Sequence, residues 1–151
     1  MNKHYIEQGV KILTPLLFYS RVYLLARPIY SGLGQILMFH RVLPESGKLR
    51  IHNHKSLEVS PEHLENIIQY FKNLDYDFIS LDELNNIKEN PRKKKFVVFT
   101  FDDGYVDNYT FAYPIFKKHN VPFTIYVATN MPDGNAILWW YLLEDLIVKN
   151  F

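Results

Sequence analysis

One stretch of the sequence is much more apolar than its surroundings and predicts the centre of the fold. Residues 96–101 are mostly apolar and β-prone, and apolar and polar positions do not alternate along them. That pattern is typical of a strand buried on both faces of a parallel sheet. Asp102, Asp103 and Gly104 follow directly. We therefore expect two carboxylates at the carboxyl end of a central strand, where α/β folds bind ligands.

Shorter apolar runs alternate with segments of helical spacing on either side of this strand. Ser60 and Pro61 are a favourable start for a helix, and a second helix carries Leu84 and Ile87. Alternation of strands and helices is typical of a parallel α/β sheet, with about four βα units here. The predicted strands cover residues 35–39, 78–80, 96–101 and 123–128, and the other predicted helices cover residues 61–74, 112–119 and 138–149.

Residues 1–34 show a helical, partly amphipathic pattern and form a segment of their own. Pro15 and Pro28 are expected to limit the helix, and the apolar stretch Leu16–Ala26 contains Arg21. That stretch is shorter than the roughly 20 apolar residues that span a bilayer, and no clear signal-peptide cleavage site follows it. Two interpretations stay open, a helix packed on the domain and a helix lying on a membrane surface. The predicted location is cytoplasmic or peripheral to a membrane.

Two other segments carry expectations of their own. Residues 41–59 are polar and predict a long loop, with His52 and His54 spaced to share one side of an extended chain. Because no third ligand is near, solvated loop histidines are favoured over a metal site. Residues 138–149 are apolar over most of the helix surface, which predicts burial or an interface.

Composition limits the classes of protein to consider. The 151 residues suggest one domain, and a 48% hydrophobic content argues against disorder. The net charge of +1 gives no bulk attraction to nucleic acid. Because the sequence has no cysteine, disulfides and thiolate metal sites are excluded.

Adjacent carboxylates at the end of a strand have a chemical use. Successive side chains of a strand point different ways, so one carboxylate can hold a metal ion while the other takes a proton from a metal-bound water. A divalent ion lowers the pKa of that water to roughly 7. A polar turn that merely closes the strand would show the same three residues, Asp102, Asp103 and Gly104.

The longer string Thr100-Phe101-Asp102-Asp103-Gly104-Tyr105 resembles the first motif of the polysaccharide deacetylases, the NodB-homology group of carbohydrate esterase family four. Asn108 and the segments at 113–119 and 121–127 continue the resemblance, and residues 36–42 resemble the first strand of the subgroup that includes intercellular-adhesin deacetylases. The resemblance covers residues 35–151, which form the predicted domain that follows the helical segment 1–34. It implies a (β/α) barrel, here a partial one because a complete barrel takes roughly 250 residues.

The resemblance also implies an activity and roles for residues. The expected reaction is metal-dependent removal of acetyl groups from an acetylated polysaccharide or amino sugar. Asp102 would be the general base and Asp103 a ligand of a divalent metal, expected to be zinc. His40, Thr100 and Tyr105 are candidates for the rim of the active site.

The sequence departs from the family pattern after this region. The second motif, His-Ser/Thr-x-x-His, would supply two metal ligands, but no histidine follows His119. We therefore expect the front part of a deacetylase domain, or a shortened relative, with little activity alone. A partial barrel would leave sheet edges open, through which chains would self-associate.

Two other functions are compatible with parts of this sequence. A non-catalytic remnant would bind saccharide or a membrane-bound biosynthetic partner, and its sugar-stacking candidates would be Tyr105, Tyr109, Trp139 and Trp140. A haloacid-dehalogenase-like phosphatase also has a strand that ends in aspartate. That class needs one residue between its two aspartates, whereas Asp102 and Asp103 are adjacent, so we do not favour it.

Overall fold

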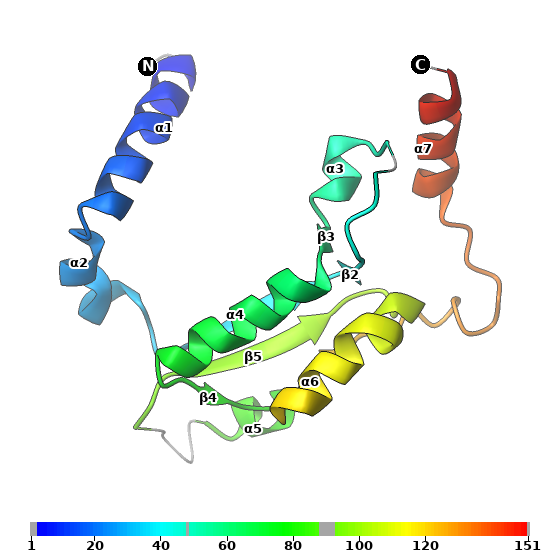
Figure 1. Cartoon of the computed structure of the whole chain (residues 1–151). Coiled ribbons are helices and arrows are strands. Elements are labelled where there is room, and N and C mark those ends of the chain that lie inside the picture. The colour runs from blue at the N-terminus through cyan, green and yellow to red at the C-terminus, as the bar shows by residue number, and fades with distance from the viewer. Residues whose placement is uncertain (1–2, 48, 88–92, 151) are drawn as a thin grey trace. The chain divides into compact units, whose positions relative to one another are not determined.

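A computed structural model describes residues 3–47, 49–87 and 93–150 (Figure 1). Within these residues the chain forms two compact units, which divide between Gly34 and Gln35.

The N-terminal unit contains two helices, α1 (Lys3–Tyr19) and α2 (Tyr23–Tyr30). Pro15 lies inside α1, so the prediction that it limits the helix is wrong. A proline removes one helical hydrogen bond, and water can bind the freed carbonyl of exposed Lys11. The helix ends instead near Arg21, whose φ of +56° is left-handed. No helix in the described part of the chain is long and apolar enough to cross a membrane.

The second unit is built on a four-stranded sheet. Strand β5 (Phe96–Phe101) lies between β1 (Gly34–Phe39) and β4 (Asp77–Phe78), and β6 (Thr124–Ile125) also pairs with β5. The β4–β5 and β5–β6 pairs are parallel, as predicted. Strand β6 is shorter than the predicted 123–128 because its partner, β5, ends at Phe101.

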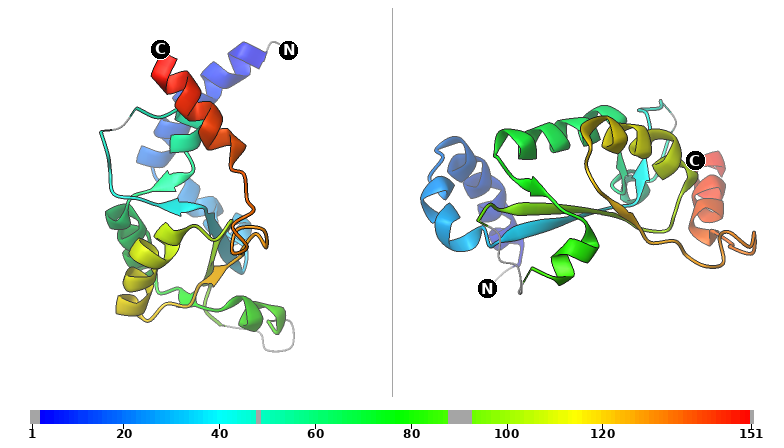
Figure 2. Two further views of the ribbon diagram at one scale, coloured as in Figure 1. Left: turned by 90° about the vertical axis from the view of Figure 1, so that its right-hand side faces the viewer. Right: turned by 90° about the horizontal axis from the view of Figure 1, so that it is seen from below.

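Every residue of β5 is buried, which confirms the predicted central strand. Its odd-numbered residues belong to the larger core, which α4 (Pro61–Asn73) and α6 (Tyr113–His119) cover. Phe96 and Val98 point the other way, into a smaller cluster beside α5 (Leu81–Asn85). Figure 2 shows α4 and α6 on one side of the sheet and α5 on the other.

In the described part of the chain the sheet is open. The structure therefore shows the predicted α/β sheet but does not show the barrel that the resemblance implied. Strand β1 forms one edge of the sheet, and its Ile36 and Met38 side chains are exposed.

Residues 41–59 are called the strap from here on, and their described part, 41–47 and 49–59, is more ordered than the predicted loop. Strands β2 (Arg41–Val42) and β3 (Glu58–Val59) pair in parallel, and the short helix α3 (His52–Lys55) lies between them in sequence. The prediction failed because a polar stretch with no periodicity gives no sign of a two-residue ladder.

The last helix, α7 (Trp139–Asn150), does not bury its apolar side chains within the described residues. Of the two alternatives predicted for it, burial is therefore wrong and an interface stays a prediction. Glu144 is its only buried residue among those described. The apolar side chains that are exposed include Trp139, Leu142, Leu143, Leu146 and Ile147.

Candidate active site

Three strands end together around the two aspartates. The backbone N–H of Asp102 donates to the carbonyl of Phe39 at the end of β1, at 2.8 Å. The carbonyl of Phe101 accepts from Tyr126, just after β6, at 2.8 Å. The carboxyl end of β5 is therefore fixed on both sides, and Asp102 and Asp103, both partly exposed, follow it directly.

His40 lies at the same end of the sheet. Its Nε2 is 4.0 Å from Oδ2 of Asp102, and the two side chains are 23% and 32% exposed. Its carbonyl accepts a 2.9 Å hydrogen bond from Nδ2 of Asn108. The structure thus brings His40 and Asp102 within reach of one another and of solvent.

The turn after β5 has an unusual backbone. Asp103 has φ of +72° and Gly104 has φ of +74°, both in the left-handed region that favours glycine. A Cβ on Gly104 would lie 3.1 Å from a methyl group of Val127. Glycine is therefore required at 104 by conformation and by space, whereas Asp103 is a carboxylate held in a strained conformation. Such strain is frequent at functional sites.

The other two predicted rim residues differ in position. Thr100 is 4% exposed and its Oγ1 lies 3.5 Å from the carbonyl of Leu37, so it belongs to the sheet interior. Tyr105 is partly buried under the guanidinium of Arg41, which lies 4.7 Å from the ring centre. Its burial, the neighbouring hydroxyl of Tyr141 and the charge of Asp103 raise the pKa of Tyr105.

Asp107 is a buried carboxylate that the sequence analysis missed. It is 3% exposed. Its Oδ1 accepts from the backbone N–H of Val42 at 2.9 Å, and its Oδ2 lies 2.9 Å from both Nε and Nη2 of Arg41. With Asn108, which binds the carbonyl of His40, Asp107 fixes the first residues of the strap next to Asp102.

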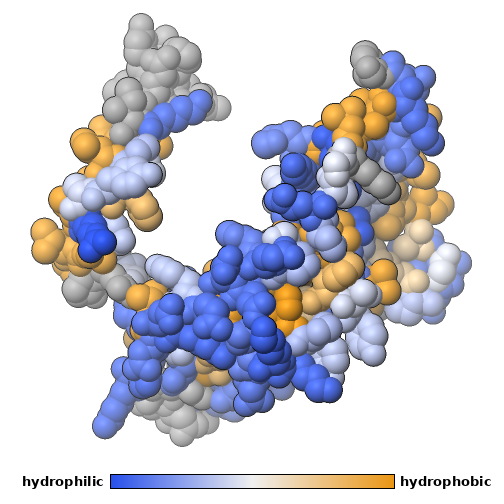
Figure 3. All heavy atoms as spheres, in the orientation of Figure 1, coloured by the Kyte–Doolittle hydropathy of each residue, from blue (hydrophilic) through white to orange (hydrophobic). Residues whose placement is uncertain are grey.

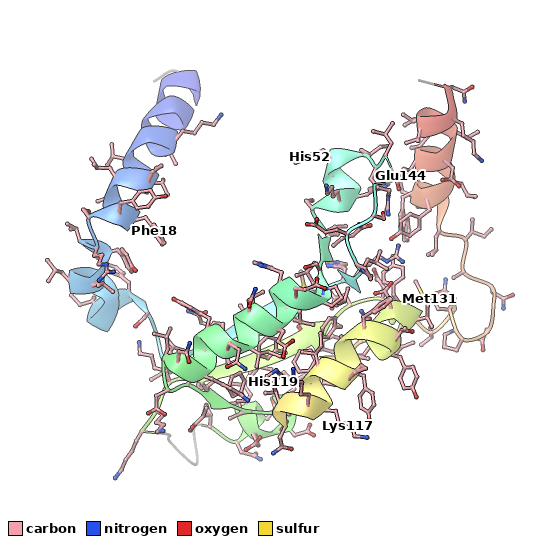
Figure 4. All side chains as sticks on the ribbon, viewed as in Figure 1. Phe18, His52, Lys117, His119, Met131 and Glu144 are labelled. Carbon is pink, nitrogen blue, oxygen red and sulfur yellow. The ribbon has the colours of Figure 1, made fainter. Side chains whose placement is uncertain are left out.

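Glu144 of α7 holds the other end of the strap and was also missed. Its Oε1 accepts from Nε of Arg50 at 2.9 Å and from the backbone N–H of Ile51 at 2.8 Å. Its Oε2 lies 3.0 Å from Nδ1 of His54, and Figure 4 shows Glu144 directed toward α3. Burial alone would raise its pKa, but these partners outweigh burial and lower the pKa of Glu144 to about 2.

A second contact joins α7 to the strap. Nη1 of Arg41 donates to the hydroxyl of Tyr141 at 3.0 Å, and that hydroxyl lies 3.4 Å from the hydroxyl of Tyr105.

The two histidines of the strap differ in their surroundings: His54 lies against Glu144, while His52 is exposed. One signal for Glu144 was present in the sequence, because it is an acidic residue inside the apolar 138–149 segment. Asp107 had no such signal.

Two hollows among the described residues of this unit bear on the site. The strap and the start of α4 line one of about 340 Å³, with Arg50, Lys55, Glu58 and His63 among its charged and polar side chains. Strand β1 and α4 line the other, which is mostly apolar and about 580 Å³. Neither lining includes Asp102 or Asp103.

The described residues do not by themselves fit a divalent metal ion. A catalytic zinc site uses about three protein ligands, and no group of three His, Asp or Glu side chains suited to a metal occurs among residues 3–47, 49–87 and 93–150. Asp102, Asp103 and His40 supply oxygen and nitrogen donors at one end of the sheet, but they do not form such a group.

Comparison with known proteins agrees with this picture. Residues 89–147, which include β5 and both aspartates, match the protein family described as Polysaccharide deacetylase. Over these residues the chain is similar to the polysaccharide deacetylases. The resemblance predicted from the sequence is therefore confirmed.

Individual relatives show the same similarity. The chain is 33% identical over 94 residues to YxkH of Bacillus subtilis, which is 61% of this chain and 30% of that protein. It is 33% identical over 77 residues to poly-β-1,6-N-acetyl-D-glucosamine N-deacetylase of Staphylococcus epidermidis, which is 50% of this chain and 27% of that protein.

Solved structures of deacetylases resemble this chain in fold. Deacetylase PplD of Streptococcus pyogenes, solved in complex with acetate, is 32% identical with a TM-score of 0.55, over 67% of this chain and 45% of that one. IcaB of Ammonifex degensii is 27% identical with a TM-score of 0.53, over 62% and 37% of the two chains. The chain thus spans less than half the length of these relatives.

Proposed function

We propose that this chain acts in the hydrolysis of N-acetyl groups on an amino-sugar polymer, as a polysaccharide deacetylase. The observation that carries the proposal is the placement of Asp102 and Asp103 at the carboxyl end of β5, inside the residues that match the family. The similarity to an N-acetylglucosamine polymer deacetylase of Staphylococcus epidermidis supports this substrate class. The acetate bound by the Streptococcus pyogenes relative supports acetate as the product.

In the proposed reaction Asp102 is the general base. Its carboxylate takes a proton from water, the water oxygen bonds to the acetamide carbonyl carbon, and the C–N bond then breaks. The proton goes to the amine nitrogen, so the products are a free amino sugar and acetate. Asp102 is suited to this step because its backbone is fixed by Phe39 while its side chain stays partly exposed.

The roles of the neighbouring residues belong to the same proposal. Asp103 would be one ligand of a divalent ion, with zinc the proposed ion, although the described residues offer no complete ligand set. His40, 4.0 Å from Asp102, would face the substrate at the rim. Tyr105 would contribute to the rim through its contact with Arg41, whereas Thr100 would only support β5 from inside.

Acetate release from an N-acetylglucosamine oligomer tests the proposal. We expect little release from these 151 residues alone, even with zinc, because the described residues offer no complete ligand set. Whatever release occurs is expected to fall to background in Asp102→Asn, which keeps the size of the side chain. Asp145→Asn, an exposed position on α7, is the matched control and should release acetate like the unaltered chain. Acetate release that persists in Asp102→Asn would show that Asp102 is not the general base.

A non-catalytic saccharide-binding chain is the second candidate. Tyr109 is 71% exposed and stacks on Tyr113, and Trp139 is 62% exposed, so these aromatic faces are open to sugar rings. Tyr105 is less suited because Arg41 covers its ring. Oligomer binding observed by NMR, without acetate release and lost in Trp139→Ala, would favour this candidate over the enzyme.

We also propose self-association through the open edge of the sheet. Ile36 and Met38 are exposed on β1, and an uncovered apolar edge strand favours pairing with another chain. Sedimentation velocity should show a concentration-dependent larger species that Met38→Lys reduces. A monomer at all concentrations would contradict this proposal.

A further inference from the structure

The N-terminal helices carry much apolar side-chain surface. Leu16 is 66% exposed on α1 and Leu25 is 81% exposed on α2. Burying such side chains releases free energy in proportion to their apolar area, so a surface of this kind usually has a partner. Other exposed apolar residues here are Val10, Leu13, Leu17, Phe18, Tyr19, Val22, Tyr23, Leu24, Ile29, Tyr30 and Leu33. Figure 3 shows orange, apolar patches on the visible face of this unit.

Helix α1 has one apolar side and one mixed side, on which Phe18 lies with Lys11 and Pro15. Val10, Leu13 and Leu17 are spaced three and four residues apart, so they share one side of the helix. Lys11 and Pro15 share another side. Because Pro15 has no N–H, the carbonyl of Lys11 lacks its helical partner. That carbonyl needs water, so the side with Lys11 and Pro15 suits solvent and the side with Leu13 suits burial.

The joint between the two helices is structured. The left-handed Arg21 separates α1 from α2, and the rings of Phe18 and Tyr23 stack across the joint with centres 5.9 Å apart and planes 4° apart. Phe18 is labelled in Figure 4. The stack links the ends of α1 and α2, so apolar side chains of both helices can contribute to one surface.

The charge of the N-terminal helices indicates which kind of apolar partner they would bind. The sequence has no Asp or Glu between Glu7 and Glu45, whereas Lys11, Arg21 and Arg27 lie within that stretch. Lys and Arg beside apolar side chains are typical of helices that lie in the interface of a bilayer with anionic lipids. Tyrosine is also enriched at that depth.

We propose that residues 8–34 bind the surface of a bilayer that contains anionic lipids. Side chains such as Leu13, Leu16 and Leu25 enter the boundary between headgroups and acyl chains, while Lys11 and Arg21 lie at the level of the phosphates. The helices lie on the membrane and do not cross it, in keeping with the lack of a helix of spanning length in the described residues. This inference does not depend on deacetylase activity.

Vesicle flotation with the full chain tests the proposal. The probes are vesicles of phosphatidylcholine alone and vesicles of phosphatidylcholine with phosphatidylglycerol. The chain should float with the anionic vesicles and less with the neutral ones, and added salt should weaken binding without abolishing it. Arg21→Glu should weaken binding to anionic vesicles roughly thirtyfold, because it changes two unit charges at the surface.

An apolar substitution has a matched control in the other unit. Leu16 and Leu146 are 66% and 62% exposed leucines on helices α1 and α7. Leu16→Glu should abolish flotation, and Leu146→Glu should leave it unchanged, with circular dichroism confirming that both variants are folded. Binding lost only in Leu146→Glu would place the membrane contact on α7.

Two other outcomes would overturn the inference. Flotation that is equal on both kinds of vesicle and insensitive to salt would show that binding does not depend on anionic lipid. Absence of flotation, with Leu16→Glu converting a dimer to a monomer in sedimentation, would assign the apolar surface to a second copy of the chain.

Discussion

The carboxylate of Glu144 on α7 accepts a hydrogen bond of 2.8 Å from the backbone N–H of Ile51 in the strap. Arg50 donates to the same oxygen, and Glu144 is only 4% exposed. A buried carboxylate is costly unless such partners satisfy it. Polar contacts around this one side chain therefore join the strap to α7, in addition to the contacts of Tyr141.

Glu144→Gln should lower the free energy of unfolding at pH 7 by about 2–4 kcal/mol, because Arg50 loses a buried charged partner. The folded pKa of Glu144, about 2, lies below its ordinary value of 4.5. The stabilisation is therefore complete above that ordinary value and is lost as the pH falls toward 2. Denaturant unfolding from pH 7 to 2 checks this, with Asp145→Asn as control. A constant difference between Glu144→Gln and the unaltered chain across that range would contradict it.

Val98→Asp should prevent folding or cost more than about 4 kcal/mol. Val98 is 1% exposed and packs with Ile79 and Phe96, where a carboxylate would find no partner. Met38→Asp is the control. Because Met38 is 60% exposed on β1, this substitution should lower the free energy of unfolding only slightly. Thermal unfolding of both variants decides, and an unchanged melting temperature for Val98→Asp would place β5 outside the core.

The fold around β5 was predictable because its signal is local. Six successive β-prone residues bounded by Asp102 and Gly104 specify a buried strand, and the capped helix at Ser60 follows from residue types alone. The strap and the contacts of Asp107 and Glu144 were not predictable. They depend on partners 65 and 93 residues away, and short-range patterns carry no information about such pairs.

Gly104→Ala should cost about 2–4 kcal/mol, more than Gly134→Ala. Both glycines have a left-handed backbone, with φ of +74° and +71°, so alanine adds strain of order 1 kcal/mol at each. Only at Gly104 would the new methyl group meet Val127, at 3.1 Å, while Gly134 has open space. The difference between the two variants in the free energy of unfolding, measured with denaturant, thus reports the contact with Val127. Equal costs would show that Val127 does not lie against Gly104 in solution.

Variants of Asp103 test whether the carboxylate at this position is needed for the reaction or for the stability of the fold. Its φ is +72°, a conformation that glycine adopts freely, that asparagine and aspartate tolerate, and that alanine disfavours by about 1 kcal/mol. We expect Asp103→Ala to be the least stable variant, Asp103→Asn to match the unaltered chain within about 0.5 kcal/mol, and Asp103→Gly to equal or exceed it. Asp75, at φ of +56° in the turn after α4, is the control and should show the same order.

If Asp103→Ala is as stable as Asp103→Gly, the left-handed turn is absent. If the order holds and Asp103→Asn also loses acetate release, the carboxylate serves the reaction and not the fold, because the amide preserves the backbone and removes only the charge.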